Sequence, residues 1–141
     1  MYQKDYILRM IEMMADFIRA VLALIGKREI DQATHMVENA YVDFLKQEAA
    51  FFLSIPAESL TEKLLKEHNF THGHLEVLAE LMLLEAELYI ASNKPDQATD
   101  YLKRAHGLFY YLLNHSGTYS PVYESRLSDI ERKMLTRDNS E

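Results

Sequence analysis

Three histidines in one short stretch are the side chains of this sequence best suited to hold a metal ion. His68, His72 and His74 lie close together in the chain, with Glu67 and Glu76 on either side. Imidazole nitrogens bind zinc well, but a zinc site needs three or four ligands that converge on the ion. The chain has no Cys to complete such a set, and the stretch has the composition of a solvated loop. We therefore predict no metal and no cofactor, with these three histidines as the alternative metal site.

Other residue types that support catalysis form no motif. A carboxylate-bridged di-iron centre needs Glu-x-x-His on facing helices, and this spacing does not occur in the chain. No Ser or Thr has a plausible His and acid in its sequence context, and the four glycines are scattered singly instead of forming a phosphate-binding loop. We predict that the protein is not an enzyme.

Tyrosines are concentrated in the C-terminal third of the chain, at Tyr101, Tyr110, Tyr111, Tyr119 and Tyr123. Tyr offers a large apolar surface with a polar tip, so one interpretation is an aromatic pocket or a partner contact. The interpretation that we favour places Tyr101 in the core and the other tyrosines over the last helical hairpin.

Helices must position these residues, because apolar side chains recur at three- and four-residue steps along most of the chain. The pattern predicts helices over residues 4–26, 30–52, 57–67, 73–92, 95–114 and 121–135, with a loop over 68–74. Pro56 ends the second helix, and Pro95 and Pro121 begin the last two. No segment alternates as a strand does, so the expected fold class is all-α. Residues 1–136 form one expected domain, and residues 137–141 a frayed tail.

Composition excludes several classes of partner. The formal net charge is −7 and Lys and Arg are not clustered, which argues against nucleic acid. No stretch of about 20 apolar residues occurs, so we expect no membrane span. Because Cys is absent and the N-terminus lacks the pattern of a secretory signal, we expect a cytoplasmic protein.

The first predicted helix is apolar over more than half of its circumference. A helix of this kind is either covered on two sides within its own domain or pressed against a second subunit. Both possibilities stay open. We expect a homodimer, formed through this helix or through the C-terminal aromatic face.

A four-residue sequence occurs twice, as Asp31-Gln32-Ala33-Thr34 and as Asp96-Gln97-Ala98-Thr99. The residues that follow continue the match, with Val37 and Ala40 in the first copy and Leu102 and Ala105 in the second. Each copy comes just after the start of a predicted helix that follows another one closely. The repeat therefore predicts two antiparallel helical hairpins, joined by a short helix and followed by a C-terminal helix.

These hairpins resemble the tetratricopeptide repeat, a helix-turn-helix unit of about 34 residues. Its small and aromatic positions match Ala86, Tyr89, Ala98 and Ala105 in the second copy and Phe17, Ala33 and Ala40 in the first. The closing Pro is missing from both, and Val21 and Leu24 replace two consensus residues. Residues 2–12 and 52–60 also look like an uncharacterised family of short bacterial proteins with such hairpins. That resemblance implies the fold and a bacterial cytoplasmic setting, but no activity.

The resemblance implies a protein–protein interaction module in which the first helix of each hairpin lines a concave face. Carried over to this sequence, the partner-binding positions are Ala15, Ile18, Leu22 and Ile25 in the first hairpin and Glu80, Leu83 and Glu87 in the second. An apolar strip beside an acidic one suits a basic amphipathic segment of a protein partner. The alternative is a small-molecule binder or enzyme with an aromatic or Met-lined pocket of about 300 Å³ between the hairpins.

Overall fold

The computed structural model describes residues 2–115, 117 and 120–138 of the chain, and the side chains of residues 6–115, 117 and 120–136. These residues form helices and no strand, which confirms the all-α fold for the described part of the chain. The elements are α1 (Tyr2–Gly26), α2 (Ile30–Leu45), α3 (Ala49–Leu53), the 3-10 helix η1 (Ala57–Ser59), α4 (Leu60–Glu67), α5 (His72–Ala91), α6 (Pro95–His115) and α7 (Pro121–Asp138).

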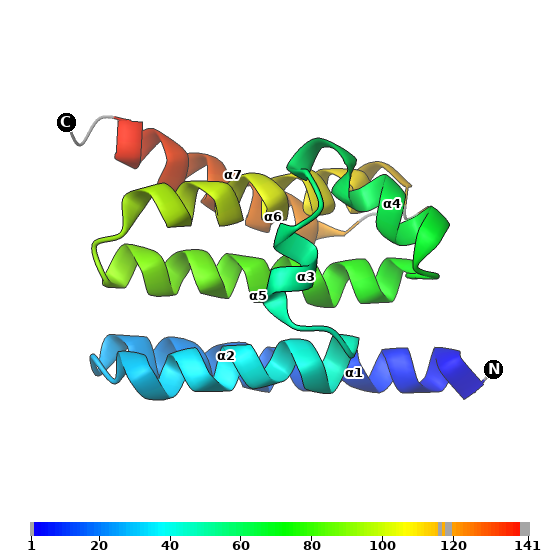
Figure 1. Cartoon of the computed structure of the whole chain (residues 1–141), viewed down its shortest axis with the longest axis horizontal. Helices are drawn as coiled ribbons and strands as arrows, with labels where there is room; N and C mark the ends of the chain where they lie inside the picture. Colours follow the sequence, from blue (N-terminus) through cyan, green and yellow to red (C-terminus); the bar gives the residue numbers. More distant parts are fainter. Residues whose placement is uncertain (1, 116, 118–119, 139–141) are drawn as a thin grey trace.

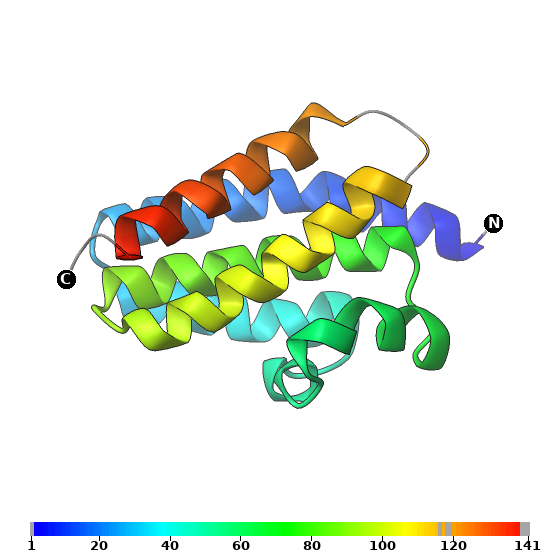
Figure 2. The ribbon, with the colours of Figure 1, turned by 90° about the horizontal axis from the view of Figure 1, so that it is seen from above.

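Helix α5 is the centre of the molecule. Every residue from Val77 to Ala86 is buried, as expected for a helix that is apolar nearly all round. Figures 1 and 2 show α1 and α2 as an antiparallel pair on one side of α5, with α6 running back along α5 and α7 returning beside α6. The view from above places α1 and α7 toward one face of α5. The opposite face is covered by α2, α6 and the short helices.

The repeated sequence forms two turns with the same backbone conformation. Arg28 between α1 and α2 has φ 65°, and Asn93 between α5 and α6 has φ 58°. A residue in the left-handed region just after a helix lets the following amide bond back to the helix and so ends it. The two hairpins therefore use the same left-handed backbone conformation at equivalent positions of their turns.

Backbone hydrogen bonds repeat in the same register. The N–H of Glu29 donates to the carbonyl of Leu24, and the N–H of Lys94 to that of Tyr89, both at 2.9 Å. In the helix that follows each turn, the repeated Ala (Ala33 in α2 and Ala98 in α6) has no exposed surface. The duplication read from the sequence is thus also present in local structure and burial.

The predicted continuous helix over residues 30–52 is wrong. Helix α2 ends at Leu45, and Lys46 has φ 61°, with its N–H bonded to the carbonyl of Val42. The chain restarts as α3 in a new direction, which buries Phe52 completely. Tertiary packing decides this break, because no Gly or Pro marks it in the sequence.

Arg104 of α6 holds the end of α3. Its side chain is buried, and its Nη1 donates to the carbonyls of Phe52 and Ile55 at 3.1 and 2.7 Å. Its Nε donates to Asp100 at 3.1 Å. The terminal carbonyls of a helix lack partners within it and carry partial negative charge. The guanidinium group donates the hydrogen bonds that these carbonyls would otherwise lack. It thereby fixes the segment between α2 and α5 to α6.

The loop predicted over residues 68–74 is shorter than expected, because α5 begins at His72. Thr71 caps the helix by accepting the His74 N–H, while Nδ1 of His74 accepts the Thr71 N–H at 3.1 Å. His74 takes the place that Glu or Gln usually occupies in this reciprocal cap. Gly73 in the same turn lies so close to α1 that a methyl group there would overlap the Ile7 side chain.

The remaining expectations for the C-terminal third have mixed outcomes. Helix α7 continues to Asp138, beyond the domain end expected at residue 136, and residues 139–141 of the expected tail lie outside the described residues. Tyr101 is buried, Tyr111 and Tyr123 are half-buried and Tyr110 is exposed, while Tyr119 lies outside the described residues. Among the described helices, none combines the length and the apolar character that crossing a bilayer requires.

Candidate functional site

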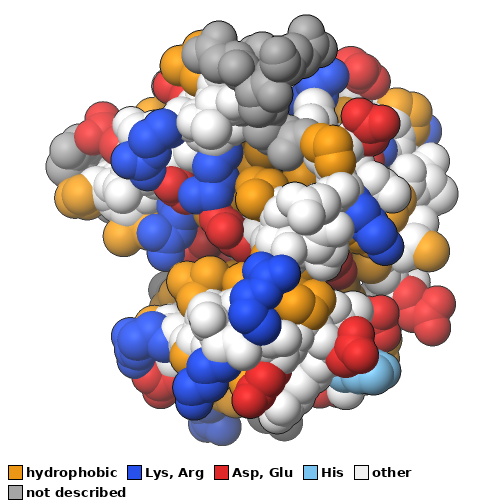
Figure 3. Space-filling model, turned by 90° about the vertical axis from the view of Figure 1, so that its left-hand side faces the viewer, with side chains coloured by type: hydrophobic (Ala, Val, Ile, Leu, Met, Phe, Trp, Pro, Cys, Tyr) orange, Lys and Arg blue, Asp and Glu red, His pale blue; other side chains and the backbone are white. Residues whose placement is uncertain are grey.

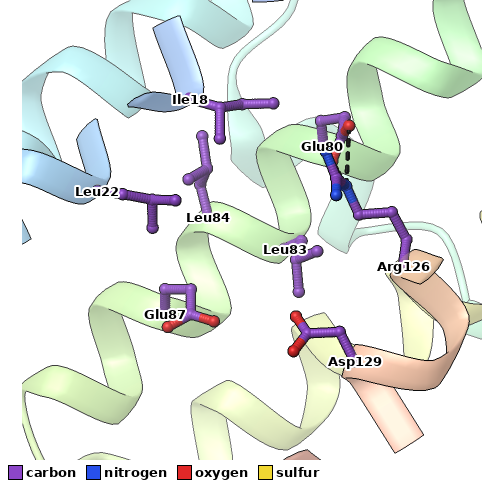
Figure 4. A pocket seen from close by; sticks show the side chains of 8 residues that line it. All are labelled: Ile18, Leu22, Glu80, Leu83, Leu84, Glu87, Arg126 and Asp129. Atoms are coloured by element: carbon purple, nitrogen blue, oxygen red, sulfur yellow. Dashed lines mark hydrogen bonds and ion pairs between the residues drawn. The ribbon is translucent and has the colours of Figure 1, made fainter. Parts of the chain in front are cut away.

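Two hollows flank α5. The first, which we call the α1–α7 groove, has a volume of about 110 Å³. It is lined by Ile18, Leu22, Glu80, Leu83, Leu84, Glu87, Arg126 and Asp129 (Figure 4). Its floor is apolar, because the leucines of α5 face the apolar residues of α1, and the charged residues stand along the side toward α7.

The α1–α7 groove brings together five of the seven residues that the tetratricopeptide resemblance assigns to partner binding: Ile18, Leu22, Glu80, Leu83 and Glu87. The other two, Ala15 and Ile25, do not line the groove, although Ala15 is exposed and Ile25 half-buried on the same helix. The sequence did not indicate Arg126 or Asp129, because α7 lies outside both hairpins.

Helix α7 neutralises the acidic strip of this groove. Nε of Arg126 donates to both carboxylate oxygens of Glu80, at 2.8 and 3.1 Å (Figure 4). Burial raises the pKa of Glu80, and the bond from Arg126 partly offsets this effect. Nζ of Lys133 lies 2.8 Å from Glu87 and 2.8 Å from Asp129. Glu80 and Glu87 therefore already have counter-charges from α7, and the binding of a basic partner segment at these acids stays a prediction.

The second hollow, which we call the α2–α6 cleft, lies on the opposite face of α5 and has a volume of about 400 Å³. It is lined by Ile30, Asp31, Thr34, Glu38, Ala49, Glu85, Leu88, Tyr89, Ser92, Lys94 and Tyr101. Several of these residues belong to the α1–α2 and α5–α6 turns or lie close to them. Figure 3 views the molecule from the end that holds these turns, where acidic, basic and hydrophobic side chains are interspersed.

Glu85 is the unusual residue of the α2–α6 cleft. Its side chain is only 6% exposed, and no hydrogen bond or ion pair joins its carboxylate to another residue that the structure describes. Burial, together with the charge of Glu38, raises the pKa of Glu85 to about 7. A buried carboxylate normally has a cation or several donors beside it, so this group is a strong candidate for ligand contact.

Tyrosines surround this carboxylate. The rings of Tyr89 and Tyr101 stack with their centroids 5.5 Å apart. The hydroxyl of Tyr41 is a buried polar atom that has no hydrogen-bond partner among the described residues. Burial raises the pKa of Tyr41, and the charge of Glu85 raises it further. The floor of the cleft thus combines a buried carboxylate with phenol groups. The sequence predicts an ordinary surface role for Glu85, which is wrong because the residue is buried, and a core Tyr such as Tyr41 belongs to no motif.

The three histidines do not form a site. His68 packs against Phe51, His72 against Tyr111 and His74 against Phe70, each with ring centroids 5.0 to 5.5 Å apart. Within the described residues, no group of three or more His, Asp or Glu side chains is placed to hold a metal ion. The histidines contact three different aromatic partners, so the geometry gives no support to the alternative metal site.

What the geometry offers is an apolar groove with paired charges on one face of α5 and a polar cleft with an unpaired carboxylate on the other. Comparison of the chain with protein-family models, with curated proteins and with solved structures found no match.

Proposed function

We propose that the protein is a non-enzymatic interaction module of the tetratricopeptide-like type, which binds an apolar helix along α1 and the α1–α7 groove. The repeated hairpin turns and the burial of Ala33 and Ala98 support the repeat-like arrangement. The bacterial cytoplasmic setting is part of this proposal.

The observation that carries the proposal is a seam of apolar residues along α1. Leu8, Ile11, Ala15, Ile18, Leu22 and Ile25 follow one another at alternating steps of three and four residues. Each of them is exposed or half-buried. This spacing is that of helices that pack side by side, and a solvent-facing stripe of this kind is typical of an interaction surface.

The residues that α1 buries within the chain lie on the neighbouring face of the helix, and Ile11, Ile18 and Ile25 of the seam also pack against the core. Ile7, Met10, Met14 and Val21 are buried, so α1 already has an internal face against the rest of the domain. The exposed members of the seam, Leu8, Ala15 and Leu22, are additional to that face. A second copy of the chain is the partner that we propose first, because two α1 helices would each cover the seam of the other. Because Arg126 and Lys133 pair with the acids of the groove, binding would depend on apolar contact and only weakly on salt.

Leu22 provides a direct test, because its side chain is 43% exposed and lines the groove. The variant Leu22→Asp should keep its helical circular dichroism and lose self-association or partner capture. Val42→Asp is the matched control, since Val42 is 45% exposed on α2 and lies outside the groove. Light scattering and photo-crosslinking from position 22 measure the effect. A strict monomer that crosslinks to nothing at position 22 would overturn the proposal.

The second candidate function is small-molecule binding in the α2–α6 cleft. Its volume of about 400 Å³ exceeds the 300 Å³ or so that a small ligand needs. Tyr89 and Tyr101 line it, whereas no Met does. The cleft and the groove lie on different faces of α5, so the two functions are independent.

A further inference from the structure

The α2–α6 cleft contains the one buried charged side chain of the described residues that lacks a partner. In the part of the chain that the structure describes, three charged residues are buried: Glu80, Glu85 and Arg104. Glu80 is bonded to Arg126, and Arg104 is bonded to Asp100 and to the carbonyls of Phe52 and Ile55. Glu85 has no such contact, although it lines a hollow of about 400 Å³. The exception points to a cation that is not part of the chain.

The residues around Glu85 favour positive charge. Glu38 and Asp31 add two carboxylates from α2, and Tyr89 and Tyr101 add aromatic rings from α5 and α6. Carboxylates accept hydrogen bonds from ammonium and guanidinium groups, and aromatic faces attract cations. All of these groups belong to the same cleft, and they come from three different helices.

The chain supplies little positive charge of its own here. Lys94 is the only basic residue among those that line the cleft, and it lies exposed in the α5–α6 turn. It makes no ion pair with Glu85 in the described structure. An incoming cation would therefore meet one buried carboxylate without displacing an internal partner.

The buried hydroxyl of Tyr41 is a second observation of the same kind. It has no partner among the described residues, and an unsatisfied buried polar group costs free energy. Tyr41 is not among the residues that line the cleft, but the charge of Glu85 adds to the effect of burial in raising the pKa of its hydroxyl. Of these two groups only the Tyr41 hydroxyl is fully enclosed without a hydrogen bond, whereas the Glu85 carboxylate lines the cleft and so is open to a ligand.

A metal ion does not suit these residues. The described part of the chain has no group of three His, Asp or Glu side chains close enough to share one ion. The volume of about 400 Å³ also exceeds what a bare ion fills, whereas it falls in the range for small organic ligands.

We propose that the α2–α6 cleft binds a small organic cation, an ammonium or guanidinium group on a short carbon chain, with Glu85 as its buried counter-ion. Glu38 is the second carboxylate, and Tyr89 and Tyr101 contact the carbon chain. This inference gives the second candidate function a ligand class and does not depend on the partner seam of α1.

Isothermal titration calorimetry with 1,4-diaminobutane and with agmatine tests the proposal on the full chain. The uncharged 1,4-butanediol is the chemical control, because it has the same carbon chain without the charges. We expect saturable binding of at least one of the two cations and none of the diol. Absence of binding by both cations, or equal binding of the diol, would overturn the proposal.

Two variants locate the binding. Glu85→Gln keeps the size of the side chain and removes its charge. It should lower the binding affinity for the cation at least about tenfold. Glu87→Gln, on the opposite side of the same helix and in the other hollow, should change the affinity less than about twofold. Because Glu85→Gln removes an unpaired buried charge, we expect it to fold. Unchanged affinity in a folded Glu85→Gln variant would show that the cation binds elsewhere and would defeat the assignment.

The same titrations keep this inference separate from the interaction proposal. Leu22→Asp should bind the cation as the wild-type chain does, and Glu85→Gln should keep any self-association. Loss of cation binding in Leu22→Asp at full helicity would contradict the placement of the site in the α2–α6 cleft.

Discussion

The two faces of α5 carry the same kind of acid in opposite circumstances. Glu80 and Glu87 are seven residues apart and share the face toward α7, where Arg126 and Lys133 pair with them. Glu85 points to the other face, where no cation of the chain reaches it. The difference teaches that the burial of a carboxylate does not reveal its role. What distinguishes an acid that holds the fold together from an acid that is free to bind a ligand is whether the chain itself supplies the counter-charge.

Removing Arg126 should have the largest effect on stability, because it leaves Glu80, like Glu85, as a buried carboxylate without a counter-charge. We expect Arg126→Met to lower the free energy of unfolding by about 3 kcal/mol at pH 7, at the lower end for a broken buried pair since Arg126 is partly exposed. Urea denaturation measures the change.

The double variant Arg126→Met with Glu80→Gln is the control. Replacing the orphaned carboxylate should recover most of the loss, because the main penalty is the uncompensated charge. If the double variant is no more stable than the single one, lost packing of the Arg126 side chain explains the effect, and the contrast between the two faces is weaker than proposed.

Glu85→Gln should have the opposite effect and raise the free energy of unfolding at pH 8. The pKa of Glu85 is raised from 4.5 to about 7, so the folded state holds the proton more tightly than the unfolded state. Protonated Glu85 contributes stability that is fully present below about pH 4.5, and this stability is lost as the pH rises through about 7 and the buried carboxyl group becomes charged. The variant should therefore equal the wild-type protein near pH 4.5 and exceed it by about 2 kcal/mol at pH 8, less than the full shift implies because the cleft admits water.

Thermal and urea unfolding of both proteins from pH 4.5 to pH 8 check this prediction. Glu38→Gln is the matched variant, because it removes the neighbouring charge that raises the pKa of Glu85. It should give a smaller gain of the same sign. A stability difference that does not vary with pH would contradict the assignment of the unpaired charge to Glu85.

Glu87→Gln should be slightly destabilising, although Glu87 is only two residues from Glu85 in the chain. It breaks the ion pair with Lys133 at 2.8 Å between two partly exposed side chains, which is worth about 0.5 kcal/mol. At pH 8 the change in the free energy of unfolding should be positive for Glu85→Gln and negative for Glu87→Gln, which is the most direct test of the comparison between the two faces. Changes of the same sign in urea denaturation would contradict that comparison.

Zinc should have the smallest effect. Because His68, His72 and His74 contact different aromatic residues, an equimolar amount of Zn²⁺ should leave the melting temperature of tag-free protein unchanged. The organic cation of the α2–α6 cleft should raise it by mass action. If zinc raised the melting temperature and His72→Ala abolished that rise, the three histidines would share a metal site after all.

Sequence reasoning found most helices and part of the groove, for reasons that are local. Apolar spacing of three and four residues is a property of single helices, and it located α1, α5, α6 and α7. It could not find the break at Lys46, because that residue bends the chain to bury Phe52 and to meet Arg104, which lies far along the chain. It placed the start of α5 late, because His74 performs a capping role usually read from Glu or Gln.

The candidate sites divide in the same way. Ile18, Leu22 and Leu83, which the resemblance assigns to partner binding, do line one hollow, and their role in binding stays a prediction. Arg126 and Lys133 were missed, because their effect depends on where α7 lies, and Glu85 was missed, because an acid in an apolar helix carries no sign of its pairing.

The sequence by itself determined the helices and the duplicated hairpin, since helical periodicity and turn chemistry act between near neighbours in the chain. Only the tertiary structure decided which face of α5 receives Arg126 and Lys133 of α7 and which face keeps an unpaired carboxylate. That choice depends on the packing of segments far apart in the sequence, and electrostatic pairing follows the distances that this packing sets.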